Sequence, residues 1–190
     1  CLVNVDVFGS PVPSARFMGG REAEIMGGID RFAVVENYDP QALLVRLPRL
    51  LADDVCAIPS FVPGVGPFPS AHGKWHNKPS DPRDQRAMTD LYLALMADAV
   101  LELIGSRASL LIEGRFGEAD VFTRALATLR AQQKVFVSLT HQDVTYGALR
   151  LAHPCLSPAS RLVPVAPLDI DLGSYAAQWR ARAQAVQVIA

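Results

Sequence analysis

The residues best suited to bind a ligand form a glycine-rich turn, Gly114-Arg-Phe-Gly117, between a predicted strand and a predicted helix. A glycine at such a point lets the backbone approach a ligand closely, and the helix start that follows favours anions or polar groups. The spacing matches neither a dinucleotide-binding fingerprint nor a phosphate-binding P-loop. A ligand site and a plain tight turn are therefore both compatible with these residues.

The other titratable residues give weaker signals. His72 and His76 have i, i+4 spacing, which suits zinc only on a helix, and their segment is predicted to be a loop. No cysteine pair has metal-ligand spacing. We interpret the acidic pairs as helix caps and solvated side chains rather than acid–base pairs; they are Asp53 with Asp54, Asp81 with Asp84, and Asp169 with Asp171. We therefore predict no metal ligands and no catalytic residues in this chain.

Three aromatic residues lie in a long segment rich in proline and glycine, residues 58–83. They are Phe61, Phe68 and Trp75. Such rings can stack on a ligand, or they can attach a long loop to the core. We favour the second interpretation, because a loop of this length in a compact domain needs anchoring.

Composition limits the class of protein. The chain has 190 residues, 18 Lys plus Arg against 19 Asp plus Glu, and 50% hydrophobic residues. This length suits one core, so we predict a single domain over residues 1–190. The near-zero net charge argues against nucleic-acid binding and against a polybasic membrane anchor. The most apolar stretch, Leu91–Ile104, contains two acidic residues and is too short to span a membrane, so we expect a cytoplasmic protein.

Hydrophobic periodicity predicts the elements that would position these residues. Alternating apolar residues predict a β-hairpin over Cys1–Met18. A helix should begin at Asp39 and Pro40 and break near Pro48. Another should span Asp84–Ile104, with an apolar stripe formed by Met88, Leu91, Leu95, Ala99 and Leu103.

The second half alternates strands and helices. Strands are predicted at Ser109–Ile112 and Lys134–Ser138, with a helix at Ala119–Arg130 between them. Residues 154–167 are predicted to be coil, and a last helix covers Ser174–Val188. This order predicts parallel β-α-β pairing and an α/β fold. Ligands in such sheets bind beyond the carboxyl ends of the strands. The turns at 113–117 and 139–143 follow the two predicted strands, so we expect a ligand to bind at these turns.

Several segments together resemble the FGGY family of carbohydrate kinases. The run from Asn4 to Glu22 (NVDVFGSPVPSARFMGGRE) is similar to one segment of these kinases. The segments Ala57–Phe68, Leu91–Met96 and Glu113–Phe116 continue the likeness in the same order. Gly147-Ala148 and the stretch from Tyr175 to Arg180 complete it. The chain also starts inside a strand-like run without an initiator Met, so we expect a fragment of a longer polypeptide.

The resemblance implies a fold and a nucleotide site. It implies a ribonuclease-H-like (actin-like ATPase) domain, with a mixed central sheet flanked by helices. The adenosine turn of the family corresponds to Glu113, Gly114, Arg115 and Phe116, and Ala119 takes the place of an Asn or Ser near the adenine. Asp143 and Gly147 fall at a later turn near the nucleotide. ATP and Mg²⁺ are the implied cofactors, with the metal ligands and the catalytic Asp expected upstream of Cys1.

The implied activity is transfer of the γ-phosphoryl group of ATP to a sugar or polyol hydroxyl. The implied partners are that substrate and the kinase's own N-terminal domain, with a homodimer as a further expectation. Two departures from the family pattern, Ala119 and Asp143, support an alternative. In the alternative, the protein is a non-catalytic member of the same fold that senses a nucleotide or a sugar.

Overall fold

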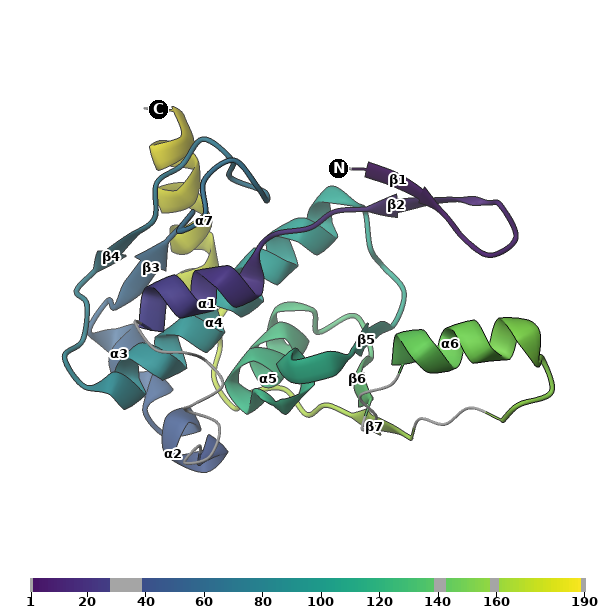
Figure 1. Ribbon diagram of the computed structural model, residues 1–190. Helices are drawn as coiled ribbons and strands as arrows, with labels where there is room; N and C mark the ends of the chain where they lie inside the picture. Colours follow the sequence, from purple (N-terminus) through teal and green to yellow (C-terminus); the bar gives the residue numbers. More distant parts are fainter. Residues whose placement is uncertain (1, 28–38, 139–142, 158–160, 189–190) are drawn as a thin grey trace.

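The structure is a computed structural model that describes residues 2–27, 39–138, 143–157 and 161–188. The described chain combines helices with short strands around a long helix, α4 (Pro82–Leu103). In Figure 1, α1 (Gly19–Gly27) lies along α4, and the C-terminal helix α7 (Gly173–Val188) stands at the upper left of the view.

The N-terminal hairpin predicted from the alternating residues is present. β1 (Leu2–Val5) pairs antiparallel with β2 (Pro11–Ser14). The turn between them is closed by Asp6, whose carboxylate accepts hydrogen bonds of 2.8 Å from the backbone N–H groups of Phe8 and Ser10. An aspartate that bonds the backbone a few residues ahead is a common way to fix such a turn. The hairpin leads directly into α1.

The predicted helix after Asp39 is divided into two. Asp39 caps α2 (Pro40–Leu44) by accepting a 3.1 Å hydrogen bond from the backbone N–H of Gln41. The helical path stops there and resumes as α3 (Leu47–Ala52), with Pro48 in its first turn. Proline is tolerated at that position because the first N–H groups of a helix have no partner inside it. The predicted break is therefore confirmed.

The segment rich in proline and glycine after α3 is held against the core. β3 (Cys56–Ile58) and β4 (Lys74–His76) form an antiparallel pair that encloses much of it. The aromatic residues anchor it, as we interpreted from the sequence. Ring contacts join Phe61 to Trp75, Phe61 to Tyr92 and Phe68 to Trp179, with centroid separations of 6.4, 5.6 and 5.6 Å.

The predicted parallel β-α-β unit is confirmed in the second half. β5 (Leu110–Ile112) and β6 (Val135–Ser138) pair in parallel, and α5 (Asp120–Leu129) connects them. A further strand, β7 (Leu162–Pro164), pairs antiparallel with the other side of β6. The prediction of coil over residues 154–167 is wrong at β7, because a short edge strand tolerates proline.

The helix α4 is buried on nearly all sides along its middle. α1, α5 and β3 all pack on it. Met88, Leu91 and Leu95 are buried as predicted, but Ala99 is only half-buried and Leu103 is 56% exposed. The single-stripe prediction is wrong at Leu103, because the last turn lies beyond the elements that cover the middle. Other buried positions on α4 include Thr89, Asp90, Tyr92, Leu93, Ala94 and Met96.

A buried ion-pair cluster connects α4 to α5 and α7. Asp98 on α4 is 3% exposed and pairs with Arg130, which follows α5, at an Nε–Oδ1 distance of 2.6 Å. It also pairs with Arg180 on α7. The indole N–H of Trp179 donates a 2.8 Å hydrogen bond to the carbonyl oxygen of Ala57 in β3. Further contacts come from Tyr175, whose hydroxyl donates a 2.8 Å hydrogen bond to the carbonyl oxygen of Val55, and from Arg182, which pairs with Asp54 at 2.7 Å.

The described residues show mixed α/β content with small sheets. Their strands form three separate sheets, β1–β2, β3–β4 and β5–β6–β7. A mixed sheet flanked by helices is therefore present, but it has three strands within the described residues. The prediction that one central sheet organises the domain is confirmed only in that smaller form.

Candidate functional site

The turn that carries most of the predicted site residues lies where two parallel strands end. Ile112 and Val137 are partners near the ends of β5 and β6, so the residues after both strands leave the same edge of the sheet. Directly after β5, residues Gly114–Glu118 form a short 3₁₀ helix, η2, which contacts β6. The structure therefore brings Glu113–Phe116 to the edge at which a ligand was expected.

Gly114 has the backbone conformation that only glycine adopts easily. Its φ is +68°, whereas Glu113 just before it is extended, with φ −122° and ψ 161°. A Cβ placed on Gly114 would meet no atom within 4 Å. The glycine is therefore required by the turn, and the space beside its backbone is open to a ligand.

Phe116 and Ala119 support the turn from the protein side. The Phe116 ring packs against Phe122 of α5 at a centroid separation of 5.0 Å. It also lies so close to Gly19 that a Cβ there would be 3.0 Å from the ring. Ala119 is 3% exposed and is the N-cap residue of α5, with no side-chain hydrogen bond to the helix. These two residues connect η2 to α5 and α1, whereas Arg115 is exposed.

The second predicted turn is described only in part. Residues 139–142 lie outside the described residues, and so does the side chain of Asp143. The helix α6 (Asp143–Ala152) begins at that residue, and Gly147 is exposed within it. In Figure 1, α6 stands beside the β5–β7 sheet, apart from α5. The described residues therefore include the end of β6 and the backbone at the start of α6, but not the turn between them.

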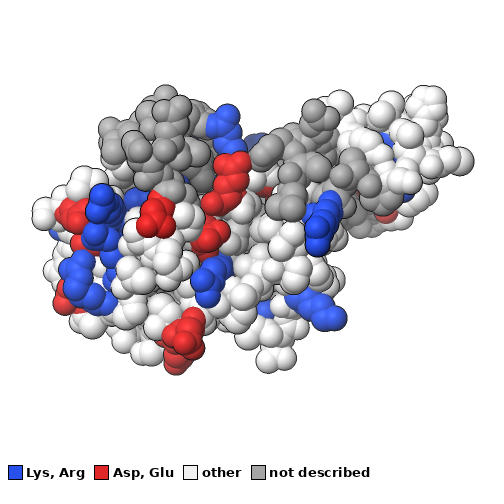
Figure 2. Space-filling model, turned by 90° about the horizontal axis from the view of Figure 1, so that it is seen from below, with Lys and Arg blue, Asp and Glu red and all other residues white. Residues whose placement is uncertain are grey.

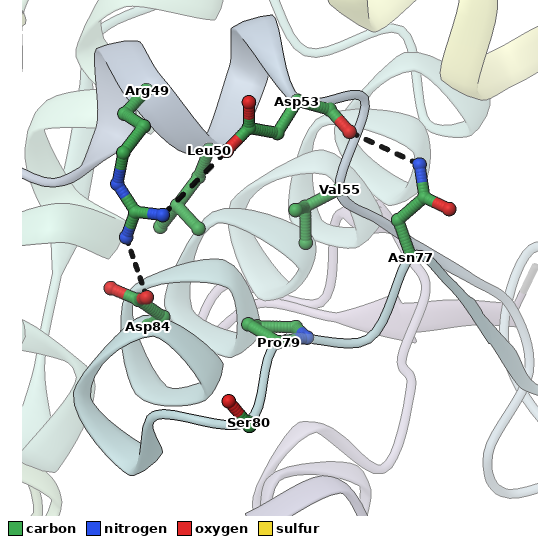
Figure 3. A pocket seen from close by; sticks show the side chains of 8 residues that line it. All are labelled: Arg49, Leu50, Asp53, Val55, Asn77, Pro79, Ser80 and Asp84. Carbon is green, nitrogen blue, oxygen red and sulfur yellow. Dashed lines mark hydrogen bonds and ion pairs between the residues drawn. The ribbon is translucent and has the colours of Figure 1, made fainter.

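A cavity of about 230 Å³ lies elsewhere, between α3, β4 and the start of α4. Figure 3 shows its lining: Arg49, Leu50, Asp53, Val55, Asn77, Pro79, Ser80 and Asp84. Its polar side chains largely bind one another. Arg49 Nη2 lies 2.6 Å from Asp84 Oδ2, and Asn77 donates a 3.1 Å hydrogen bond to the carbonyl oxygen of Asp53. No predicted site residue lines this cavity.

The acidic residues at the start of α4 differ from one another. Asp81 caps the helix, as interpreted, and the backbone N–H of Arg83 holds the pKa of its carboxyl below the usual value. The interpretation of Asp84 as a solvated residue is wrong. Asp84 is 5% exposed and pairs with two arginines, Arg46 just before α3 and Arg49 within it, with distances of 2.6 Å to Arg46 Nη1 and to Arg49 Nη2.

A buried carboxyl that sequence reasoning missed lies on α1. Glu22 is fully buried, and its Oε2 accepts hydrogen bonds from the Tyr92 hydroxyl and, at 3.4 Å, from the backbone N–H of Phe61. Burial raises the pKa of this carboxyl above the usual value, and the hydrogen bonds offset part of that effect. Its Oε1 has no hydrogen-bond partner among the described residues, nor does the buried hydroxyl of Ser60.

The described surface and side chains give three further facts. Basic and acidic side chains are interspersed over much of the face shown in Figure 2. No group of three or more His, Cys, Asp or Glu side chains in the described part of the chain could hold a metal ion, and His76 is an exposed residue of β4, 3.2 Å from Asp54. Among the described helices, none has the length and apolar character needed to cross a membrane.

Comparison with solved structures places this architecture among kinases. A carbohydrate kinase from Novosphingobium aromaticivorans is 50% identical, with a TM-score of 0.88; the match covers 95% of this chain and 40% of that one. A xylulose kinase from Rhodospirillum rubrum is 16% identical, with a TM-score of 0.59, over 90% of this chain and 37% of that one. The second likeness concerns the fold alone. The chain thus spans less than half the length of either kinase.

Sequence comparison identifies the family. No curated protein matches the chain. The family model described as the C-terminal domain of carbohydrate kinase FGGY matches residues 1–160. That match covers well over half of the sequence, from the N-terminal hairpin through α6. The chain therefore belongs to the FGGY family of carbohydrate kinases and corresponds to the C-terminal domain of its members.

Proposed function

We propose that the full-length protein is a cytoplasmic, ATP-dependent sugar or polyol kinase in which this domain binds the adenosine end of ATP. The observation that carries the proposal is the open space beside the Gly114 backbone, at the edge where β5 and β6 end. Membership of the FGGY family supports the reaction class, transfer of the γ-phosphoryl group to a hydroxyl. The fold we propose for the complete domain is the ribonuclease-H-like fold of actin-like ATPases.

The residues around the turn leave its backbone open to a ligand. Gly114 presents backbone without a side chain, and Glu113 brings the chain to it in an extended conformation. Phe116 and Ala119 fill the space behind the turn, so they act by holding it in place. Asp143 and Gly147 belong to α6, the helix that follows β6, and we propose that they face the nucleotide from there.

In this proposal, a different part of the protein binds the phosphates and the metal. Mg²⁺ would neutralise charge on the transferring phosphoryl group. We assign its ligands, the catalytic base and most sugar contacts to the N-terminal domain of the longer kinase. This domain's own contribution is to orient the nucleotide, and closure of the two domains excludes water from the reacting groups.

One observation favours a non-catalytic member of the family as a second candidate. Ala119 is buried at the N-cap of α5, so it offers no hydrogen bond to an adenine at the position where the resemblance implies Asn or Ser. A sensor would bind nucleotide or sugar without turnover. Coupled-enzyme detection of ADP formed by the full-length protein, across a panel of sugars and polyols, separates the two candidates. Binding without ADP formation supports the sensor.

The nucleotide site is tested with a matched pair of glycine variants. Gly105 ends α4 with φ +64°, and a Cβ there would also meet nothing within 4 Å. Gly114→Val and Gly105→Val therefore carry the same backbone strain, but only the first is at the proposed site. By calorimetry on the full-length protein, we expect Gly114→Val to weaken ATP binding about 5- to 150-fold, the cost of a branched side chain in a close contact. Gly105→Val should bind ATP as the parent does.

The result can contradict the proposal clearly. Equal ATP affinity in the parent and in Gly114→Val would show that the nucleotide does not contact this turn. Equal weakening in both variants would assign the effect to strain instead of the site. Sugar binding should be nearly unchanged in both variants.

A further inference from the structure

Two buried polar atoms lie where α1 meets the segment after β3. They are Oε1 of Glu22 and the hydroxyl oxygen of Ser60, and both residues are fully buried. Within the described part of the chain, neither atom has a hydrogen-bond partner. The large majority of buried polar side-chain atoms in proteins do have one, because an unpaired buried group loses its hydration without compensation. These two atoms therefore point to a bound ligand.

Both atoms belong to one contact between the two segments. The other oxygen of the Glu22 carboxyl, Oε2, accepts a 3.4 Å hydrogen bond from the backbone N–H of Phe61, the residue that directly follows Ser60. Oε2 also accepts a hydrogen bond from the Tyr92 hydroxyl on α4. The carbonyl oxygen of Ser60 accepts a 2.6 Å hydrogen bond from the N–H of Gly73. Oε1 and the Ser60 hydroxyl are thus the atoms of this contact that still need a partner.

The backbone at this contact is held in place by packing. A Cβ on Gly73 would be 2.6 Å from Cγ of Phe61 and 2.7 Å from its backbone, so the two residues already touch. The Phe61 ring also contacts Trp75 and Tyr92, with centroid separations of 6.4 and 5.6 Å. Because neither Ser60 nor its neighbour is free to move toward α1, a small third group is needed to join the hydroxyl to the carboxyl.

Water suits these two atoms better than an ion does. A carboxyl oxygen and a hydroxyl together require both donors and acceptors, and water supplies both. A bound metal ion of the Ca²⁺ type needs six or more oxygen ligands. No group of three or more His, Cys, Asp or Glu side chains among the described residues could hold a metal. A buried water, by contrast, typically makes two to four hydrogen bonds to polar groups that otherwise lack partners.

We propose that Oε1 of Glu22 and the hydroxyl of Ser60 bind one buried water molecule, which bridges α1 to the segment after β3. A water-mediated link of this kind is nearly as favourable in enthalpy as a direct hydrogen bond. It would help to fix α1, the helix whose Gly19 lies against the ring of Phe116. The inference concerns the interior of the domain and does not depend on the proposed nucleotide site.

A crystal structure of the full-length protein, at a resolution that shows ordered waters, tests the proposal directly. We expect one peak of electron density about 2.7–3.2 Å from both Glu22 Oε1 and Ser60 Oγ, the range of ordinary hydrogen bonds. In the variant Ser60→Ala this peak should disappear, because the water loses one of its two side-chain partners.

The stability of Ser60→Ala gives a second test, in which the sign of the change decides. If the hydroxyl binds water, its removal loses a hydrogen bond, and the unfolding equilibrium constant should rise about fivefold in chemical denaturation. If the hydroxyl is unpaired, its removal relieves a buried polar group and the constant should fall. Ser70 is exposed in the same segment and provides the matched control. Ser70→Ala should stay within about twofold of the parent.

Three results would overturn the proposal. The first is the absence of a density peak between Glu22 Oε1 and Ser60 Oγ in the parent protein. The second is a peak surrounded by six or more oxygen atoms at about 2.3–2.6 Å, which would be a metal ion. The third is a Ser60→Ala variant at least as stable as the parent. A bridging peak together with a destabilised Ser60→Ala supports the buried water.

Discussion

Glu22 is the residue whose environment differs most from what its type suggests. The carboxyl is fully buried between α1, α4 and the segment after β3, and the groups that contact it are a hydroxyl and a backbone N–H rather than a cation. Burial without a positive partner disfavours the charged form. The pKa of this carboxyl is therefore raised in the folded protein from the ordinary value of 4.5.

This raised pKa predicts how Glu22 contributes to stability at different pH values. The folded state binds the proton of Glu22 more tightly than the unfolded state does, so the stabilising contribution is fully present below about pH 4.5. This contribution is lost as the pH rises through the raised pKa that Glu22 has in the folded protein. In the isostere Glu22→Gln the group is neutral at all pH values. We expect the free energy of unfolding of Glu22→Gln, relative to the parent, to increase with pH across that range in chemical denaturation.

Glu24 provides the matched control for this measurement. It lies two residues away on α1 and is partly exposed, with its carboxylate 2.8 Å from Arg21 Nη1. The difference between Glu24→Gln and the parent should show no comparable rise with pH. Parallel pH profiles for Glu22→Gln and the parent would contradict the burial argument.

Sequence reasoning identified those residues whose role depends on near neighbours in the chain. Asp39 and Asp81 are caps, and Gly114 turns the chain with a positive φ, because each role is fixed within a few residues. Glu22 and Asp84 were not identified as buried. Their partners come from elements 35 or more residues away, and no local pattern records such contacts.

At the scale of elements, the helix α4 shows which part of a periodic pattern is reliable. Its existence and limits follow from local signals, but its exposure depends on which neighbours cover it. An apolar stripe predicts one buried face. With α1, α5 and β3 packed around it, most of the middle is buried and the last turn is not. The same limit explains why β7 was missed, since a three-residue strand exists only through its pairing with β6.

Two leucines on that predicted stripe should therefore differ in their energetic importance. Leu95 is 2% exposed in the middle of α4, whereas Leu103 in the last turn is 56% exposed. We expect Leu95→Ala to reduce the free energy of unfolding by about 2–5 kcal/mol, because it leaves a cavity among packed neighbours. Leu103→Ala should change it by less than about 0.5 kcal/mol. Chemical denaturation of both variants checks the contrast, and equal losses would contradict the burial of α4 described above.

At the scale of the molecule, contacts distant in sequence determine how the elements are arranged. The order of strands and helices predicted the parallel pairing of β5 with β6. It did not predict that α7 returns to the core, where Trp179 bonds to β3 and Arg180 reaches α4. The candidate nucleotide edge was predicted because it follows from that local strand order. The attachment of α7 was not, because it joins residues more than 80 positions apart.

The buried cluster at Asp98 should be central to this arrangement. Asp98→Asn removes the charge that neutralises Arg130, and the guanidinium of Arg130 is itself only 7% exposed. Breaking a buried ion pair costs about 3–5 kcal/mol, and Glu102, which lies 3.3 Å from Arg130 Nη1 but is 61% exposed, offsets only part of that loss. Arg180 is about half exposed, so water can replace it as a partner of Asp98, and Arg180→Ala should cost about 1 kcal/mol or less. We therefore expect the denaturation midpoint to be highest in the parent, slightly lower in Arg180→Ala, and well below both in Asp98→Asn. If Asp98→Asn were as stable as Arg180→Ala, the cluster would not hold α4, α5 and α7 together, and α7 would depend for its attachment on its other contacts, those of Tyr175, Trp179 and Arg182.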